Sequence, residues 1–253
     1  MTLADKCANL YAVARLGYRG NAEALPVGVL LANAVLGPLF YVLYFTFVRY
    51  GAGTGVEPEQ ILLVGFLLMP VGTSVFYLAT IFARLRNWGV LRYIIVSQVG
   101  LFEFGLTQVI WAAGIAVLTV LVVALPTMLA LGSGFAVITH FSIATVIACL
   151  SLSFVGLLCA MAIISMRDYQ IFINSLFFIV VLTSGVVDDL SGLMDHLLMV
   201  NPLRPLVRWM EDTGGTHMRD WRLGLACCVG LAYVFLAWIA TQIQERRIET
   251  QDI

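Results

Sequence analysis

Potential metal ligands gather in one polar stretch, residues 188–220, which separates two long apolar segments. The stretch contains three carboxylates and one histidine close together in the sequence: Asp188, Asp189, Asp195 and His196. Carboxylate and imidazole groups can ligate a metal, but in a polar segment they more often form a solvated or helix-capping face. The sequence therefore predicts no metal site, and it assigns no role to these four side chains.

Nucleophilic and nucleotide chemistry are just as poorly represented. Ser133 stands between two glycines, but glycine and serine are the ordinary residues of a turn. The only lysine, Lys6, precedes Cys7, whereas a phosphate-binding loop requires a lysine followed by serine or threonine. We predict no catalytic residue and no cofactor in this chain. If ATP drives the protein, ATP and Mg²⁺ are bound by a partner chain.

Most of the remaining sequence is apolar. Of the 253 residues, 61% are hydrophobic and 11% are charged, against about 25% charged in an ordinary soluble domain. The mean hydropathy is +0.96. One helical crossing takes about 20 apolar residues, so the length allows roughly six crossings. These values exclude a soluble enzyme and predict one all-α membrane domain over 1–253, and the net charge of −1 predicts no nucleic-acid partner.

Apolar runs predict six transmembrane helices with short polar or glycine-rich connections. Their expected bounds are 25–48, 59–82, 104–129, 135–165, 169–187 and 221–243. Before the first span, residues 3–24 place apolar side chains on one helical face and Asp5, Asn9, Arg15 and Arg19 on the other. This pattern predicts an amphipathic helix that lies in the membrane interface.

The basic residues predict the orientation of the spans. If the N-terminus is cytoplasmic, nine of the 14 lysine and arginine residues fall on the cytoplasmic side and five on the other. Cytoplasmic loops carry the excess of positive charge. With an even number of spans, we expect both termini in the cytoplasm and the chain in the inner (plasma) membrane.

Ionisable groups are nearly absent from the predicted spans. Glu103 and His140 lie near the ends of the third and fourth spans, where we expect them at the membrane interface. Ion-coupled transporters keep carboxylates or histidines at membrane depth in spite of their energetic cost. The sequence therefore argues against a proton-driven pump.

The segment between the second and third spans carries the most informative pattern. It contains Arg84, Arg86, Asn87, Trp88, Gly89, Val90, Leu91 and Arg92, followed by Ser97-Gln98-Val99. In order and spacing it resembles the segment that joins the second and third spans of ABC-2-type transporter permeases, the transmembrane subunits of type V-like ABC exporters. Val90 stands where that family usually has threonine, and Gln98 where proline is common.

Two other segments agree with this resemblance. The interfacial helix over 3–24 is similar to the family's N-terminal connecting helix. Residues 188–210, which contain Asn201-Pro202-Leu203, resemble the family's extracellular re-entrant pair of short helices before the last span. The competing interpretations are a helix that stops before a proline and, for the arginines of 84–92, an anchor at the cytoplasmic surface.

The resemblance implies a permease that forms a substrate pathway as a homodimer or with a second permease, among membrane lipids. Separate ABC ATPase subunits would drive it, with residues 84–102 as the cytoplasmic coupling helix. The residues expected to couple the permease to the ATPase are Arg84, Arg86, Asn87, Trp88, Gly89, Leu91 and Arg92, with Arg15 and Arg19 in the interfacial helix. Among them, Arg84, Arg86 and Arg92 are expected to contact the ATPase groove, with Trp88 as a packing anchor. The implied substrate is an exported drug- or antibiotic-like amphiphile or a lipid-linked glycan.

Aromatic side chains are the candidates for the pathway lining: Phe40, Tyr41, Tyr44, Phe172 and Phe177. The competing interpretation assigns them to the lipid-facing surface or to the core of a membrane helix. The competing function is an uncoupled channel or a secondary carrier, which would leave the arginines of 84–92 without a specific partner.

Overall fold

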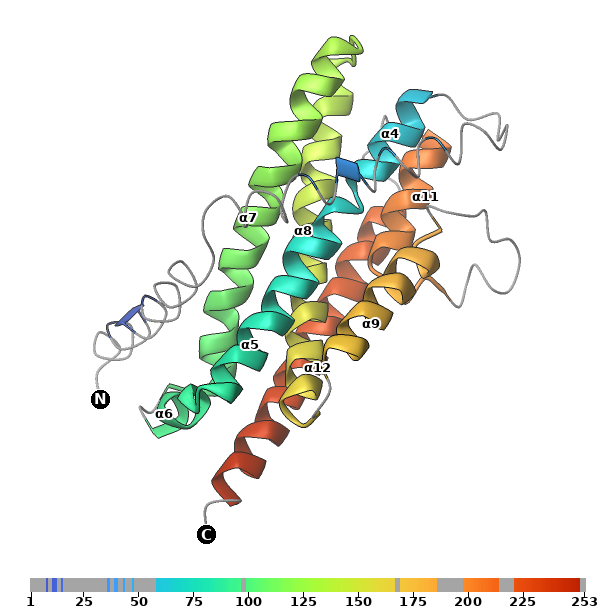
Figure 1. Ribbon diagram of the computed structural model, residues 1–253. Helices are drawn as coiled ribbons and strands as arrows, with labels where there is room; N and C mark the ends of the chain where they lie inside the picture. The colour runs from blue at the N-terminus through green and yellow to red at the C-terminus, as the bar shows by residue number, and fades with distance from the viewer. Residues whose placement is uncertain are drawn as a thin grey trace.

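The protein is an all-helical bundle in the part of the chain that its computed structural model describes (Figure 1). That part comprises residues 58–96, 99–166, 169–185, 198–213 and 221–250. It also includes nine single positions, namely Ala8, Tyr11, Ala12, Arg15, Leu36, Leu39, Phe40, Leu43 and Phe47. Every regular element within it is a helix, as the composition predicts.

The helices follow one another along the chain with short connections. Their bounds are α4 Pro58–Phe66, η2 Val71–Phe76, α5 Tyr77–Asn87, α6 Val90–Val96, α7 Leu101–Ala130, α8 Phe135–Ile164, α9 Tyr169–Thr183, α11 Leu203–Thr213 and α12 Trp221–Thr250. The element η2 is a π-helix.

Four stretches of the described residues are long and apolar enough to cross a membrane: Leu62–Asn87, Leu101–Ala130, Phe135–Ile164 and Trp221–Ile248. They confirm the long apolar helices predicted at 59–82, 104–129, 135–165 and 221–243. At the predicted fifth span, α9 has 15 residues, fewer than the about 20 that a full crossing takes. The predicted first span, 25–48, lies largely outside the described residues.

Helix α8 forms the centre of the bundle. It packs against α12, α7, α5 and η2. Small residues allow these helices to approach closely: a Cβ added at Gly156 of α8 would lie 2.9 Å from the Ser74 carbonyl oxygen of η2. At Gly230 of α12, the corresponding atom would lie 2.5 Å from the Ser151 hydroxyl of α8. Small residues at such crossings are typical of helices that pack within a membrane.

The outer helices expose apolar surface. In the most apolar window of each stretch, 22% of the residues of Trp221–Ile248 are buried, compared with 78% for Leu62–Asn87. Exposed side chains include Ile110 and Leu118 on α7 and Leu231 and Phe235 on α12. A helix that is apolar on its packed face and on its exposed face is typical of a membrane span.

The first of the four stretches, Leu62–Asn87, is interrupted by η2. Pro70 precedes η2 and has no N–H group to donate, so the regular α-helical hydrogen-bond pattern cannot continue through it. The Thr73 hydroxyl donates to the Pro70 carbonyl oxygen at 3.3 Å. Ser74 is fully buried, and its hydroxyl has no hydrogen-bond partner among the described residues. A π-helical turn therefore divides this stretch into α4 at one end and α5 at the other.

The alternating direction of the helices gives the bundle two ends. At one end, here called the basic end, lie α6 and the C-terminal ends of α5, α8 and α12 (Figure 1). At the opposite end, the α11 end, α11 packs against α4 and α12. The described parts of the predicted coupling and re-entrant segments, 84–96 and 198–210, therefore lie at opposite ends of the bundle.

Candidate functional site

The turn between α5 and α6 is built around one glycine. The Trp88 N–H donates to the Arg84 carbonyl oxygen at 2.9 Å, and the Gly89 N–H to the Arg86 carbonyl oxygen at 3.0 Å. Gly89 has φ 69°, in the left-handed region that favours glycine. The Trp88–Gly89 pair therefore ends α5 and starts α6 immediately afterwards.

Helix α6 is amphipathic. Leu91 and Ile94 are buried in a cluster with residues of α5, α7 and α8, including Phe82 and Phe104. On the outside, Arg92 is exposed, and Trp88 and Tyr93 have 54% and 74% of their surface exposed. Apolar anchors therefore hold a short helix that presents Arg92 and Tyr93 outward, with Trp88 exposed in the turn before it. The predicted coupling segment, 84–102, is divided among the last turn of α5, this short helix and the first residues of α7.

The Arg86 side chain points into the bundle, toward the end of α8. Its guanidinium donates to the carbonyl oxygens of Ile163 at 3.1 Å and Ile164 at 3.2 Å, and also to that of Met166. The last carbonyls of a helix lack intrahelical donors and carry the negative end of its dipole. The Arg86 cation therefore stabilises the C-terminal end of α8, a contact that connects two segments far apart in the sequence.

A second side chain reaches the same helix end from α12. The Gln244 amide donates to the Met161 carbonyl oxygen at 2.9 Å and to the Ser165 hydroxyl at 2.8 Å. Gln244 is 8% exposed. The sequence contained one signal for this role, because Gln244 and Thr241 are polar residues one turn apart, and both prove to be buried on one face of α12.

Positive charge is concentrated at the basic end. The described arginines here are Arg84, Arg86, Arg92, Arg246 and Arg247. Arg84, Arg246 and Arg247 make no ion pair with any other described residue. Arg92, Arg246 and Arg247 are exposed, and Arg84 is half-buried. Arg84, Arg246 and Arg247 are therefore cations to which the described residues offer no carboxylate partner.

At the α11 end, Asn201 joins α9 to α11. Its side-chain oxygen accepts from the Leu203 N–H at 2.9 Å, which makes Asn201 the N-cap of α11 with Pro202 at the first helical position. Its amide nitrogen donates to the Val180 carbonyl oxygen at 2.7 Å and the Thr183 hydroxyl at 2.8 Å. The Asn201-Pro202-Leu203 motif thus begins a helix and fastens it to the end of α9.

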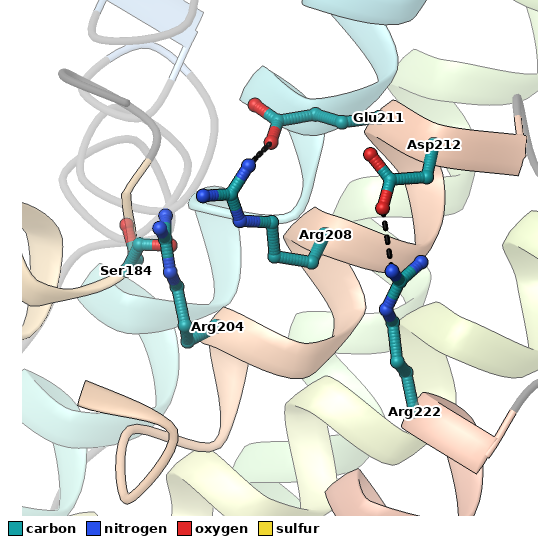
Figure 2. A network of polar contacts seen from close by, with 6 residues as sticks. All are labelled: Ser184, Arg204, Arg208, Glu211, Asp212 and Arg222. Atoms are coloured by element: carbon teal, nitrogen blue, oxygen red, sulfur yellow. Dashed lines mark hydrogen bonds and ion pairs between the residues drawn. The ribbon is translucent and has the colours of Figure 1, made fainter. Parts of the chain in front are cut away.

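Arg204 is completely buried at this end. Its guanidinium donates to the Ser184 carbonyl oxygen at 3.4 Å and lies directly against Gly185, which has φ 78° (Figure 2). The sequence interpretation missed this burial, although Arg204 shares a helical face with the buried Val207.

The other described arginines of the α11 end are paired with carboxylates (Figure 2). Arg208 lies 3.8 Å from the Glu211 carboxylate, and Arg222 of α12 lies 2.6 Å from the Asp212 carboxylate. Both acids lie on α11, so the charges of Arg208 and Arg222 are neutralised locally.

The remaining candidate residues are only partly described. Phe40 is 71% exposed, and Phe172 packs against the buried residues Ala79, Ala83 and Ile163. Arg15 is exposed and helical. Tyr41, Tyr44, Arg19 and the side chain of Phe177 lie outside the described residues, as do Asp188, Asp189, Asp195 and His196.

Comparisons with protein families, with curated proteins and with solved structures gave no match to this chain. The resemblance to ABC-2-type permeases therefore depends on the residues and the topology described above.

Proposed function

We propose that this chain is the transmembrane permease subunit of an ATP-binding cassette exporter. The observation that carries the proposal is the α5–α6 turn: a short amphipathic helix between two long apolar helices, anchored by Leu91 and Ile94, with Trp88, Arg92 and Tyr93 outside. This geometry matches what a coupling helix needs, namely an exposed docking face and a buried face attached to two spans. ATP and Mg²⁺ would be bound by the partner ATPase.

The coupling follows from the packing of α6. Because its buried face contacts both α5 and α7, a partner that pulls on the exposed face displaces two spans together. ATP binding favours the closed pair of ATPases, and a rigid link to the spans transfers that preference to the opening of the pathway. Arg84, Arg92 and Trp88 are the proposed contacts with the ATPase, because they lie at the turn, the side chains of Arg92 and Trp88 are exposed, and aromatic rings are common anchors at interfaces.

The proposed topology has six spans, with the first at 25–48 and the fifth at 169–187. The basic end is cytoplasmic, because cytoplasmic segments carry the excess of arginine. Both termini are then cytoplasmic, the chain lies in the inner (plasma) membrane, residues 3–24 form the interfacial helix, and residues 188–210 form the re-entrant segment on the outer side.

The proposed pathway lies between two permeases, either two copies of this chain or this chain and a second one. The candidate lining is aromatic, which suits a drug- or antibiotic-like amphiphile or a lipid-linked glycan. The described spans place their ionisable residues near their ends, as with Glu103 and His140, so an ATPase rather than an ion gradient is the proposed energy source.

The test is co-purification from the native membrane in mild detergent, followed by mass spectrometry. Wild-type protein should recover a P-loop ATPase in stoichiometric amount. Trp88→Ala combined with Arg92→Glu should lose it, because these exposed side chains form the proposed docking face. Trp221→Ala is the matched control, because Trp221 is 63% exposed at the opposite end and should keep the ATPase. Wild-type preparations without an ATPase at several detergent strengths would exclude the proposal and favour a channel or carrier.

A further inference from the structure

Side chains from two helices meet at the C-terminal end of α8. The last turn of α8 is closed by backbone bonds from Ser165 to Ala162 and from Met166 to Ile163. Arg86 of α5 bonds the carbonyls of Ile163, Ile164 and Met166. Gln244 of α12 bonds the Met161 carbonyl and the Ser165 hydroxyl. The carbonyls at this helix end are thus bonded by side chains of two other helices.

Arg86 belongs to the α5–α6 turn as well as to this junction. Its carbonyl oxygen accepts the Gly89 N–H that closes the turn, while its guanidinium is held by α8. A displacement of the turn is therefore transmitted to α8 through the Arg86 side chain. All three bonds are donated by one terminal nitrogen of the guanidinium, Nη1, which places the cation among the last carbonyls of α8.

Gln244 extends the junction to α12 and toward the start of α7. It is buried against α8, and the neighbouring Glu245 carboxylate lies 3.9 Å from the position of a Cβ on Gly100, the residue that precedes α7. The ends of α5, α8 and α12 therefore meet directly beside the connection from α6 to α7.

We infer that Arg86 and Gln244 are positioning residues that join the ends of α5, α8 and α12 into one mechanical unit, which carries a displacement of the α5–α6 turn into the centre of the bundle. In this role Arg86 acts inside the permease, and Arg84 and Arg92 remain the cations for external contact. The inference rests on the proposed function only for the source of the displacement.

The first test needs no ATPase. Hydrogen–deuterium exchange of the full chain would be measured in nanodiscs of phosphatidylethanolamine and phosphatidylglycerol. Arg86→Gln should make exchange at least about fivefold faster in both 87–96 and 159–166, because it removes charged hydrogen bonds that hold both segments. Gln244→Leu should likewise make exchange at least about fivefold faster in 159–166 and 241–250, because it removes the hydrogen bonds between α12 and α8. In both variants, exchange in 203–213 at the opposite end should stay unchanged, whereas a general loss of stability would raise it as well.

Two further variants sharpen this test. Arg86→Lys should restore the wild-type exchange only in part, because the lysine ammonium keeps the charge but is a compact, strongly hydrated group on a differently shaped side chain. Arg84→Gln, in the same turn of α5, should leave 159–166 unchanged, because Arg84 makes no hydrogen bond to α8 among the described residues. The inference would be overturned if faster exchange were confined to the mutated helix, or if Arg84→Gln changed exchange in 159–166 as much as Arg86→Gln does. This holds whether or not the proposed function is correct.

The second test uses the ATPase recovered by co-purification. ATP with vanadate should alter exchange of 87–96 and 159–166 together in the wild-type complex, but only of 87–96 in Arg86→Gln. If both segments still respond together in Arg86→Gln, the junction does not transmit the displacement, although the ATPase partnership stands. If no ATPase is recovered, the proposed function fails and the exchange measured in nanodiscs alone decides the inference.

Discussion

The two ends of the bundle use arginine in different ways. At the α11 end, Arg204 is buried against Gly185, and Arg208 and Arg222 are paired with carboxylates. At the basic end, Arg86 bonds backbone carbonyls of α8, while Arg84, Arg246 and Arg247 make no ion pair among the described residues. At the α11 end, carboxylates neutralise Arg208 and Arg222. The basic end also has specific contacts, made by Arg86, but it keeps positive charge available at its surface.

This difference indicates that the two ends have different roles, one structural and one in binding a partner. Internal fastening suits an end that must hold its shape, because each buried polar contact is costly to break. Available charge beside exposed aromatic residues suits an end that binds a partner. The predictions below test this contrast in order of their expected effect on the free energy of unfolding, from the largest to the smallest.

The largest expected difference in stability between the two ends comes from two glycines with positive φ, Gly185 at the α11 end and Gly89 at the basic end. Gly185→Ala places a Cβ in collision with the Arg204 guanidinium, in addition to the left-handed strain. It should lower the free energy of unfolding by about 2–5 kcal/mol. Gly89→Ala, with no atom within 4 Å of its added Cβ, should cost only the strain of about 1–2 kcal/mol. Unfolding in detergent followed by circular dichroism measures both, and equal losses would remove the contrast.

The second prediction compares two arginine contacts. Arg86→Gln should lower the free energy of unfolding by about 1.5–3 kcal/mol, because it removes charged hydrogen bonds from the end of α8. Arg222→Gln should cost about 1 kcal/mol or less, because its partner Asp212 is 47% exposed and water screens the pair. The same detergent unfolding assay applies, and a larger loss for Arg222→Gln would mean that pairing with a carboxylate stabilises the protein more than bonding to the end of α8.

The third prediction concerns the junction of α9 and α11. Asn201→Ala removes the N-cap and both amide donors, so it should lower the free energy of unfolding by about 1–2 kcal/mol. Asn201→Asp retains the capping oxygen and should lose less. Thermal unfolding of the purified variants ranks them, and an Asp variant as unstable as the Ala variant would show that the donors to α9 matter more than the cap.

The smallest effect on stability should come from the proposed docking face. Trp88→Ala with Arg92→Glu should change the free energy of unfolding by no more than about 0.5 kcal/mol, because both side chains are exposed. The same variant should abolish ATPase co-purification. A variant that unfolds easily would instead mean that these residues hold the bundle together.

The sequence predicts the long helices well and their contacts poorly. The continuous apolar run at 135–165 became α8, Phe135–Ile164, because hydropathy and length alone determine such a helix. The π-helix after Pro70 was not predicted, although proline in a span is a signal for an irregular turn.

The sequence predicted which segment forms the candidate site, but not the directions in which its side chains point. The exposed positions of Trp88 and Arg92 agree with an amphipathic segment, since a helical period is readable from the sequence. The inward direction of Arg86 and the burial of Arg204 depend on helix ends far away in the chain, at α8 and α9. No local pattern around either arginine encodes those partners.

The central claim is that the exposed face of α6 docks an ATPase, and Tyr93 gives the most direct access to it. A photoreactive benzoyl-phenylalanine would replace Tyr93, which is 74% exposed, and cells would be irradiated before membranes are prepared. The account predicts one protein adduct, identified by mass spectrometry as a P-loop ATPase, and none from the same probe at Trp221. An unmodified chain, or adducts with lipid alone at both positions, would contradict it.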